Sequence, residues 1–101
     1  MIKHIVFFQL AEQAEGKNKS ENAQIIKDGL ENLINLIPQL KKIEVGINHP
    51  KTPSSNYDVS LYSEFDSLED LNIYQEHPEH KKIGSYIVKV KTDRVCVDYE
   101  V

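Results

Sequence analysis

The chain has little of several features that mark particular protein classes. Its single cysteine, Cys96, cannot form a disulfide within the chain, which favours a reducing compartment. Its four glycines form no glycine-rich phosphate loop, the usual device for binding nucleotides. No apolar run approaches the length of a membrane span, and the first residues include no apolar segment of signal-peptide length. We therefore expect a soluble, cytoplasmic protein.

The charge balance also excludes a class of partner. With 12 basic and 16 acidic residues, the formal net charge is −4, whereas phosphate binding needs a concentrated basic surface. We expect neither a nucleic-acid partner nor a membrane partner. A hydrophobic content of 40% and a charged content of 28% are typical of an ordinary globular protein. A length of 101 residues predicts one domain, covering residues 1–101.

Hydrophobic periodicity alternates between the strand period of two and the helix period of about 3.6. Strands are predicted where β-branched and aromatic residues alternate, at 2–10, 42–48, 57–65 and 94–101. One helix is predicted from about residue 19 to Pro38, and two shorter ones over 68–77 and 78–87. Segments 11–19 and 49–56 are predicted loops. The order βαββαβ predicts an α+β fold of the ferredoxin-like type, a four-stranded antiparallel sheet with the helices on one face.

Polar residues at suitable spacing indicate where the helices begin. Asn18 followed three residues later by Glu21 has the spacing of a capping box, and Ser67 is a suitable N-cap for the second helix. Apolar side chains then recur at spacings of three and four, which predicts one buried stripe on the first helix. Its members are Ala23, Ile26, Leu30, Leu33 and Ile37.

The strand patterns predict assembly as well as fold. In a monomer, the sheet face away from the helices should be polar at alternate positions. We assign Val95, Val97 and Tyr99 to the helix-covered face, and the patch Ile5, Phe7, Tyr62 and Cys96 to the opposite face. Apolar clusters of this kind mark interaction surfaces. We expect a homodimer that buries this patch sheet to sheet, although single exposed apolar residues are common in monomers.

The segment from Tyr74 to His80, Tyr-Gln-Glu-His-Pro-Glu-His, combines two histidines, a tyrosine and a proline. Proline disfavours helix at the preceding residue and suits the first turn of a new helix. His77 should therefore end one helix and cap the next. The resulting bend would point Tyr74 and His80 in directions that a continuous helix does not allow.

Several stretches together resemble the stress-responsive α/β barrel domain family, also called Dabb proteins. The resemblance covers nearly the whole chain, and the histidine-proline-any-histidine segment at 77–80 is its most specific part. The matching stretches are Met-Ile-Lys-His-Ile-Val-Phe-Phe at the start, Ile37-Pro38, Ile43-Glu-Val-Gly46, Tyr57-Asp-Val, Phe65-Asp-Ser-Leu-Glu, the segment from Tyr74 to His80, and Val97-Asp-Tyr-Glu-Val at the end.

The resemblance implies a ferredoxin-like monomer that pairs through its sheet into a dimeric α/β barrel. One branch of the family is a polyketide cyclase, whose tyrosine and second histidine in the helix-bend segment match Tyr74 and His80. A first-strand histidine of that enzyme matches His4. Two other polar pocket positions of the enzyme are occupied here by Leu30 and Val59.

Three functions remain open from the sequence. The first is a dimeric, stress-associated protein that binds a small apolar or aromatic molecule between sheet and helices. The second is a cyclase, lyase or isomerase in which His80 acts as general base and Tyr74 stabilises an enolate oxygen, with His4 nearby. The third is a structural or interaction module without a ligand. For each histidine, the alternative is a structural role, as a helix cap or a buried hydrogen-bonded side chain.

The sequence predicts no metal and no cofactor. His77 and His80 stand three residues apart, a spacing that binds zinc on a regular helix, but Pro78 between them disrupts that geometry. Cys96, flanked by Val95 and Val97, is predicted to be packed and unreactive. His49 lies in a proline-containing loop and should be exposed to solvent.

Overall fold

The computed structural model describes all 101 residues as an α+β fold. Strand β1 (Ile2–Leu10) is followed by a hairpin of two short strands, β2 (Gln13–Ala14) and β3 (Lys17–Asn18). Helix α1 (Lys19–Glu31) and a 3₁₀ turn (Asn32–Asn35) lead to β4 (Lys42–Ile47) and β5 (Val59–Phe65). Helices α2 (Leu68–Glu76) and α3 (Pro78–Val90) precede the last strand, β6 (Lys91–Glu100).

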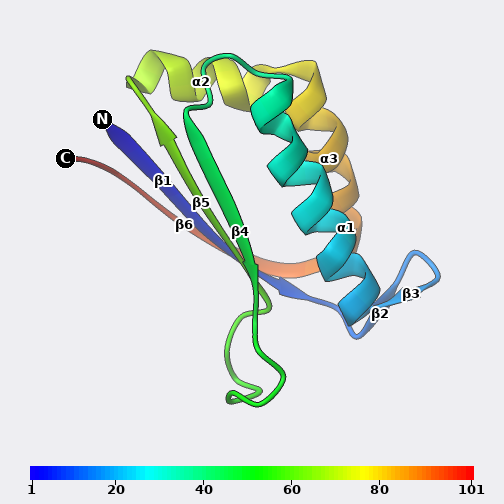
Figure 1. Cartoon of the computed structure of the whole chain (residues 1–101). Coiled ribbons are helices and arrows are strands. Elements are labelled where there is room, and N and C mark those ends of the chain that lie inside the picture. Colours follow the sequence, from blue (N-terminus) through cyan, green and yellow to red (C-terminus); the bar gives the residue numbers. More distant parts are fainter.

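The main sheet is antiparallel, with its strands in the order β4-β5-β1-β6. All three helices lie on one side of this sheet, and the opposite side is left bare (Figure 1). The predicted ferredoxin-like arrangement is thus confirmed. A core of 18 buried apolar side chains lies between the sheet and the helices, and it includes the whole predicted stripe of α1 and the turn that follows.

The predicted loop over 11–19 is wrong in part, because residues 13–18 form the β2–β3 hairpin. Its two central residues, Glu15 and Gly16, have φ values of 54° and 73°. Positive φ at both positions matches the right-handed twist of paired strands, so a two-residue turn can join them. A glycine at the second position adopts this conformation without steric cost.

The predicted capping box is present at the start of α1. The Asn18 side chain accepts from the Glu21 N–H, and the Glu21 carboxylate accepts from the Asn18 N–H. The helix ends earlier than predicted, at Glu31, where the chain tightens into the 3₁₀ turn before it reaches Pro38. The buried stripe continues through this turn because Leu33 and Ile37 still face the core.

The bend between α2 and α3 also follows the prediction. Ser67 caps α2 by accepting from the Asp70 N–H. His77 has an extended backbone, with ψ of 136°, and its Nδ1 accepts from the Glu79 N–H as the N-cap of α3. Pro78 occupies the first turn of α3. The helix runs to Val90, three residues beyond the predicted end, and β6 accordingly starts at Lys91 rather than Arg94.

The assignment of the faces of β6 was wrong. Residues directly opposite each other in an antiparallel pair share a face of the sheet. Cys96 lies opposite Val6, which is buried under the helices, so Cys96 is on the helix side and not in the outer patch. Val95, Val97 and Tyr99 instead lie on the outer face, opposite Phe7, Ile5 and Lys3 respectively.

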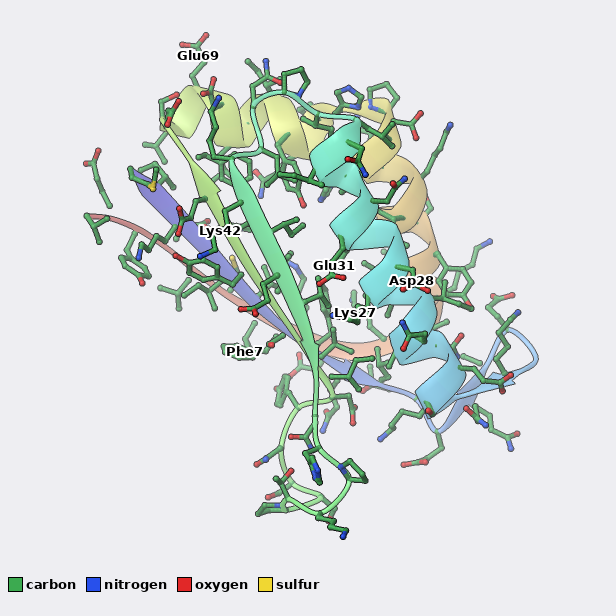
Figure 2. The ribbon with its side chains drawn as sticks, in the orientation of Figure 1. Phe7, Lys27, Asp28, Glu31, Lys42 and Glu69 are labelled. Carbon is green, nitrogen blue, oxygen red and sulfur yellow. The ribbon has the colours of Figure 1, made fainter.

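The outer sheet face is therefore more apolar than the sequence indicated. We call this surface the outer patch; it contains Ile5, Phe7, Tyr62, Val95, Val97 and Tyr99. Phe7 points away from the helices (Figure 2). The error arose because alternation along β6 shows only that its two sets of side chains face opposite ways. The pairing with β1 decides which set is outside.

Helix α1 protects the β4 edge of the sheet. Lys27 Nζ donates to the Val45 carbonyl at 2.6 Å, and the Glu31 carboxylate accepts from the Val45 N–H at 3.0 Å. The two side chains also form an ion pair and lie between α1 and β4 (Figure 2). Because an unpaired edge is a template for strand addition, these contacts disfavour pairing through β4. None of the helices has the length and apolar character needed to cross a membrane.

Candidate functional site

His4 is at the centre of the candidate site. It lies in the middle of β1 on the helix side, with the same facing as Val6 and Phe8. Its side chain is only 2% exposed, and its Nδ1 is hydrogen-bonded to Asp98, which is directly opposite on β6. A buried polar group is stabilised by such a partner, and a carboxylate at one ring nitrogen fixes the orientation of the imidazole.

The bend at His77 and Pro78 brings the two other predicted site residues together. The rings of Tyr74 and His80 have centroids 4.6 Å apart, with a 59° angle between their planes. The His4 ring is 6.5 Å from that of Tyr74 in an edge-on arrangement. Phe65 packs beneath Tyr74 at 4.9 Å. Residues from β1, α2 and α3 thus converge, which the sequence had left open, and convergence alone assigns them no chemical role.

Tyr74 has an unusual environment for a phenol. The residue is fully buried, and its hydroxyl has no hydrogen-bond partner. Burial raises the pKa of Tyr74 well above its ordinary value, because a phenolate would be poorly solvated there. Tyr74 is therefore a neutral phenol with an available donor throughout the physiological pH range.

His80 is half-buried and favours its neutral form. Burial lowers the pKa of His80 below its ordinary value, and the electrostatic influence of His4 and Arg94 lowers it further. The Gln75 backbone and the Glu76 carboxylate oppose this effect without reversing it. A neutral imidazole at neutral pH has a free lone pair, so it can accept a proton or a hydrogen bond.

His4 and His80 both line a cavity of about 170 Å³ between the sheet and the helices. Its apolar wall comes from β1, β5 and the helices, and its polar groups come from β1, α2, the first turn of α3 and the start of β6. Tyr74 lies behind His80 and does not form part of the wall. The lining residues are His4, Val6, Phe8, Leu30, Leu61, Gln75, His80, Gly84, Ile87, Val88, Lys91 and Arg94.

A larger groove, of about 620 Å³, lies elsewhere in the molecule. It runs between the outer face, at Phe7 and Val95, and the loop that joins β4 to β5, which includes His49. His49 is exposed, as predicted, and its Nδ1 accepts from the Lys51 N–H in the loop. This groove is open and adjoins the outer patch. It brings together none of the predicted site residues, so the smaller cavity is the better candidate site.

Sequence reasoning missed three polar groups of this region, namely Asp98, Arg94 and Gln75. Arg94 and Asp98 lie on the same face of β6 as Cys96, and that face was assigned from the sequence to the side away from the helices. The available signal was the alternation itself, because Arg94, Cys96 and Asp98 share one face of the strand. Only the register between β1 and β6 shows that this face adjoins His4.

Comparison with known proteins agrees with this architecture. Residues 2–101 match the Stress responsive A/B Barrel Domain family. The chain belongs to this family. A stress-response A/B barrel domain-containing protein of Arabidopsis thaliana is 28% identical over 101 residues, which make up 98% of this chain and 46% of the relative. This A/B barrel domain thus spans about half the length of that plant relative.

Solved structures show the same fold. A dimeric protein of unknown function from Bacteroides fragilis is 39% identical, with a TM-score of 0.88 over 99% of this chain and 95% of that chain. A dimeric ferredoxin-like protein of unknown function from Thermobifida fusca is 27% identical, with a TM-score of 0.80 over 99% and 90% of the two chains. A hydroxynitrile lyase from Passiflora edulis is 21% identical, with a TM-score of 0.79 over 99% and 92%, and shares the fold.

Proposed function

We propose that this A/B barrel domain forms a homodimer and binds a small aromatic or apolar molecule in the cavity between sheet and helices. The observation that carries the proposal is the cavity of about 170 Å³ with two histidines in its wall. A cavity of roughly 150 Å³ with an apolar lining accommodates benzene, so this one suits a molecule with a single ring.

Gly84 supports the existence of a retained cavity. It lies inside α3 and lines the cavity, and a Cβ added there would meet no atom within 4 Å. Glycine inside a helix costs about 1 kcal/mol relative to alanine. No steric contact requires glycine at this position. Open space at Gly84 is what a ligand site would need.

The polar part of the wall indicates what the ligand carries besides its ring. The polar residues of the wall are His4, Gln75, His80, Lys91 and Arg94, and the rest of the wall is apolar apart from one glycine. Ligand sites typically combine an apolar lining with a few polar groups that fix orientation. A ring with one hydrogen-bonding substituent matches this distribution better than a pure hydrocarbon.

The dimer rests on a separate feature. The outer patch leaves Phe7, Val95, Val97 and Tyr99 exposed on the side of the sheet that no helix covers. An isolated chain would keep this apolar surface in water, whereas a two-fold dimer would bury the same patch on both copies. The Bacteroides fragilis and Thermobifida fusca structures of this fold are dimeric proteins, which supports the same assembly here.

Binding is tested best by filling the cavity from Gly84. We would titrate the wild type and the Gly84→Leu variant with phenol, benzaldehyde and cyclohexanone, and follow backbone amide signals by NMR. The wild type should show shifts at residues around the cavity, and Gly84→Leu should show none. Gly84→Ala is the matched control, because it changes helix propensity but fills little space. A wild type that shows no shift at millimolar concentrations of any probe contradicts the binding proposal.

A second candidate function is proton abstraction from a bound carbonyl compound. The observation that favours it is the neutral His80 in the cavity wall, in contact with the unpartnered Tyr74 phenol. His80 would remove a proton next to the carbonyl group. Tyr74 would have to turn toward the cavity to donate to the enolate oxygen.

Hydrogen exchange tests this second function directly. A bound ketone in D₂O should exchange its α-hydrogens for deuterium faster with the wild type than with His80→Gln. Tyr74→Phe should slow the exchange while leaving ketone binding intact. Equal exchange rates with and without protein, under conditions where NMR shows binding, would exclude proton abstraction and leave ligand binding as the only function.

A further inference from the structure

Three metal-ligating side chains meet at the β1–β6 pair, beyond the cavity wall. The His4 Nδ1, the Cys96 Sγ and an Asp98 carboxylate oxygen all lie within 4.8 Å of one another. Their meeting follows from the register, because Asp98 is opposite His4 and Cys96 is two residues earlier on the same face. Neither strand alone would bring imidazole, thiol and carboxylate together.

We propose that His4, Cys96 and Asp98 form a binding site for Zn²⁺. Imidazole nitrogen, thiolate sulfur and carboxylate oxygen are the three protein donors that zinc uses. Hard cations such as Mg²⁺ and Ca²⁺ prefer all-oxygen sites, so the sulfur and nitrogen donors select against them. Three protein ligands leave the fourth tetrahedral position to water or to a small molecule.

The distances suit a tetrahedral ion. The Cys96 Sγ lies 3.7 Å from the His4 Nδ1 and 3.7 Å from the Asp98 Oδ1. Zinc bond lengths of about 2.3 Å to sulfur and 2.0–2.2 Å to nitrogen or oxygen place tetrahedral ligands roughly 3.5 Å apart. Sulfur is thus close to its required position relative to both other ligands.

The His4–Asp98 pair must open for the ion to enter. A charge-assisted hydrogen bond holds nitrogen and oxygen about 2.7–2.9 Å apart, which is shorter than the separation of two zinc ligands. The Asp98 side chain is 38% exposed and can move outward, whereas His4 is held in the core. Cys96 was predicted to be packed, but it is exposed, so the ion can arrive from solvent. Binding would replace the proton between His4 and Asp98 and the thiol proton of Cys96.

This site goes beyond the proposed function and does not depend on it. The cavity wall contains His4 but neither Cys96 nor Asp98. A zinc ion there would lie next to the cavity, because His4 belongs both to the cavity wall and to the proposed metal site. Metal binding and binding of a ring compound can nevertheless be tested with separate variants, because Gly84→Leu fills the cavity without removing a zinc ligand.

The single cysteine gives the experiment a specific signal. We would titrate the reduced full chain with Co²⁺, a spectroscopic substitute for Zn²⁺, and record the near-ultraviolet thiolate-to-cobalt charge-transfer band. Because the chain has one cysteine, any such band reports Cys96. We expect a band that saturates at one ion per chain and disappears when Zn²⁺ is added. Cys96→Ser should abolish it.

The remaining ligands are tested by affinity. Asp98→Asn, at a partly exposed position, should keep the fold and weaken Co²⁺ binding at least tenfold, since even second-shell changes cost about 10–100-fold. His4→Gln should do the same if it folds, and Asp98→Asn decides the matter if it does not. His49→Gln, which removes an exposed histidine, is the matched control and should bind like the wild type. A folded wild type without the band, saturation at one ion per two chains, or unchanged affinity in Asp98→Asn would overturn the proposal.

Discussion

Along β6, the polarity of the two sheet faces is the reverse of that along β1 and β5. On the helix side, β6 carries the polar residues Arg94, Cys96 and Asp98, whereas its outer side carries Val95, Val97 and Tyr99. On β1 and β5, the helix side is buried and is apolar apart from His4 and Ser63. The helices cover β1 and β5 but leave the edge strand β6 exposed along nearly its whole length.

This difference shows that the local cover of a strand, and not the sheet as a whole, decides which of its faces is polar. Where α1 and α3 cover the sheet, apolar side chains form the core. Where β6 extends beyond that cover, polar side chains can surround the cavity and hold His4. The apolar side of β6 then joins the outer patch, where a second copy of the chain is proposed to bury it.

The largest effect is expected from truncating the aromatic cluster on the covered face. Tyr74→Ala removes a fully buried ring that packs on Phe65 and His80, and should lower the free energy of unfolding by about 3–5 kcal/mol. Urea denaturation followed by circular dichroism measures this. Tyr74→Phe is the control: it keeps the ring and removes only the unpartnered hydroxyl, so it should not destabilise the protein. A loss of 2 kcal/mol or more in Tyr74→Phe, on the order of a broken buried hydrogen bond, would reveal a partner for this hydroxyl.

The second-largest effect is expected on dimer affinity, from a change in the outer patch. Val97→Asp places a charge in the outer patch of both copies, and should raise the dimer dissociation constant by at least about 100-fold. Sedimentation over a range of concentrations would measure it. Leu68→Asp is the matched control, because Leu68 on α2 is 61% exposed and Val97 is 59% exposed, but Leu68 lies outside the patch. If both variants assemble like the wild type, the outer patch is not the dimer interface.

A smaller effect is the pH dependence of stability that His80 contributes in the cavity wall. His80 has a pKa below its ordinary value of about 6.5 in the folded chain, so the unfolded chain takes up this proton first as the pH falls. Stability contributed by neutral His80 is therefore complete above about pH 6.5 and is lost as the pH falls through the lower, folded pKa. Thermal unfolding of wild type and His80→Gln between neutral and mildly acidic pH tests this. The wild type should lose more stability than the variant over that pH range. If the stability of both proteins falls in parallel with pH, the lowered pKa of His80 is contradicted.

The smallest effect comes from the cavity wall. Gly84→Ala adds a methyl group into open space within α3, and should raise the free energy of unfolding by about 0.5–1 kcal/mol through helix propensity. The urea midpoint should increase with an unchanged slope. Gly29 on α1 is the contrasting position, because a Cβ there would lie 2.5 Å from Ile83. A destabilised Gly84→Ala would mean that the space beside Gly84 is already filled in solution.

Much of the fold was predictable because its signals are local. The capping box at Asn18 and Glu21, the Ser67 cap and the break at His77 and Pro78 each depend on residues only a few positions apart. The predicted end of α1 at Pro38 was wrong because apolar spacing persists through the 3₁₀ turn. The hairpin at 13–18 was missed because its strands are only two residues long and Ala14 is their one apolar residue.

The candidate site was predictable in part, for a different reason. The resemblance placed Tyr74, His80 and His4 in one region, and the structure brings their rings together. Asp98 and Cys96 were not found because their relation to His4 is a matter of strand pairing across more than 90 residues. Alternation on β6 gives two sets of side chains and does not identify which set faces the helices.

The sequence by itself determined the element order, the helix caps, the bend that separates Tyr74 from His80, and the family to which the domain belongs. These depend on backbone preferences and on hydrophobic period, which act over a few residues. The tertiary structure alone decided the register of β6 against β1, and with it the facing of Cys96 and Val97 and the partner of His4. A shift of one residue in that register would exchange the two faces, because side chains alternate along a strand.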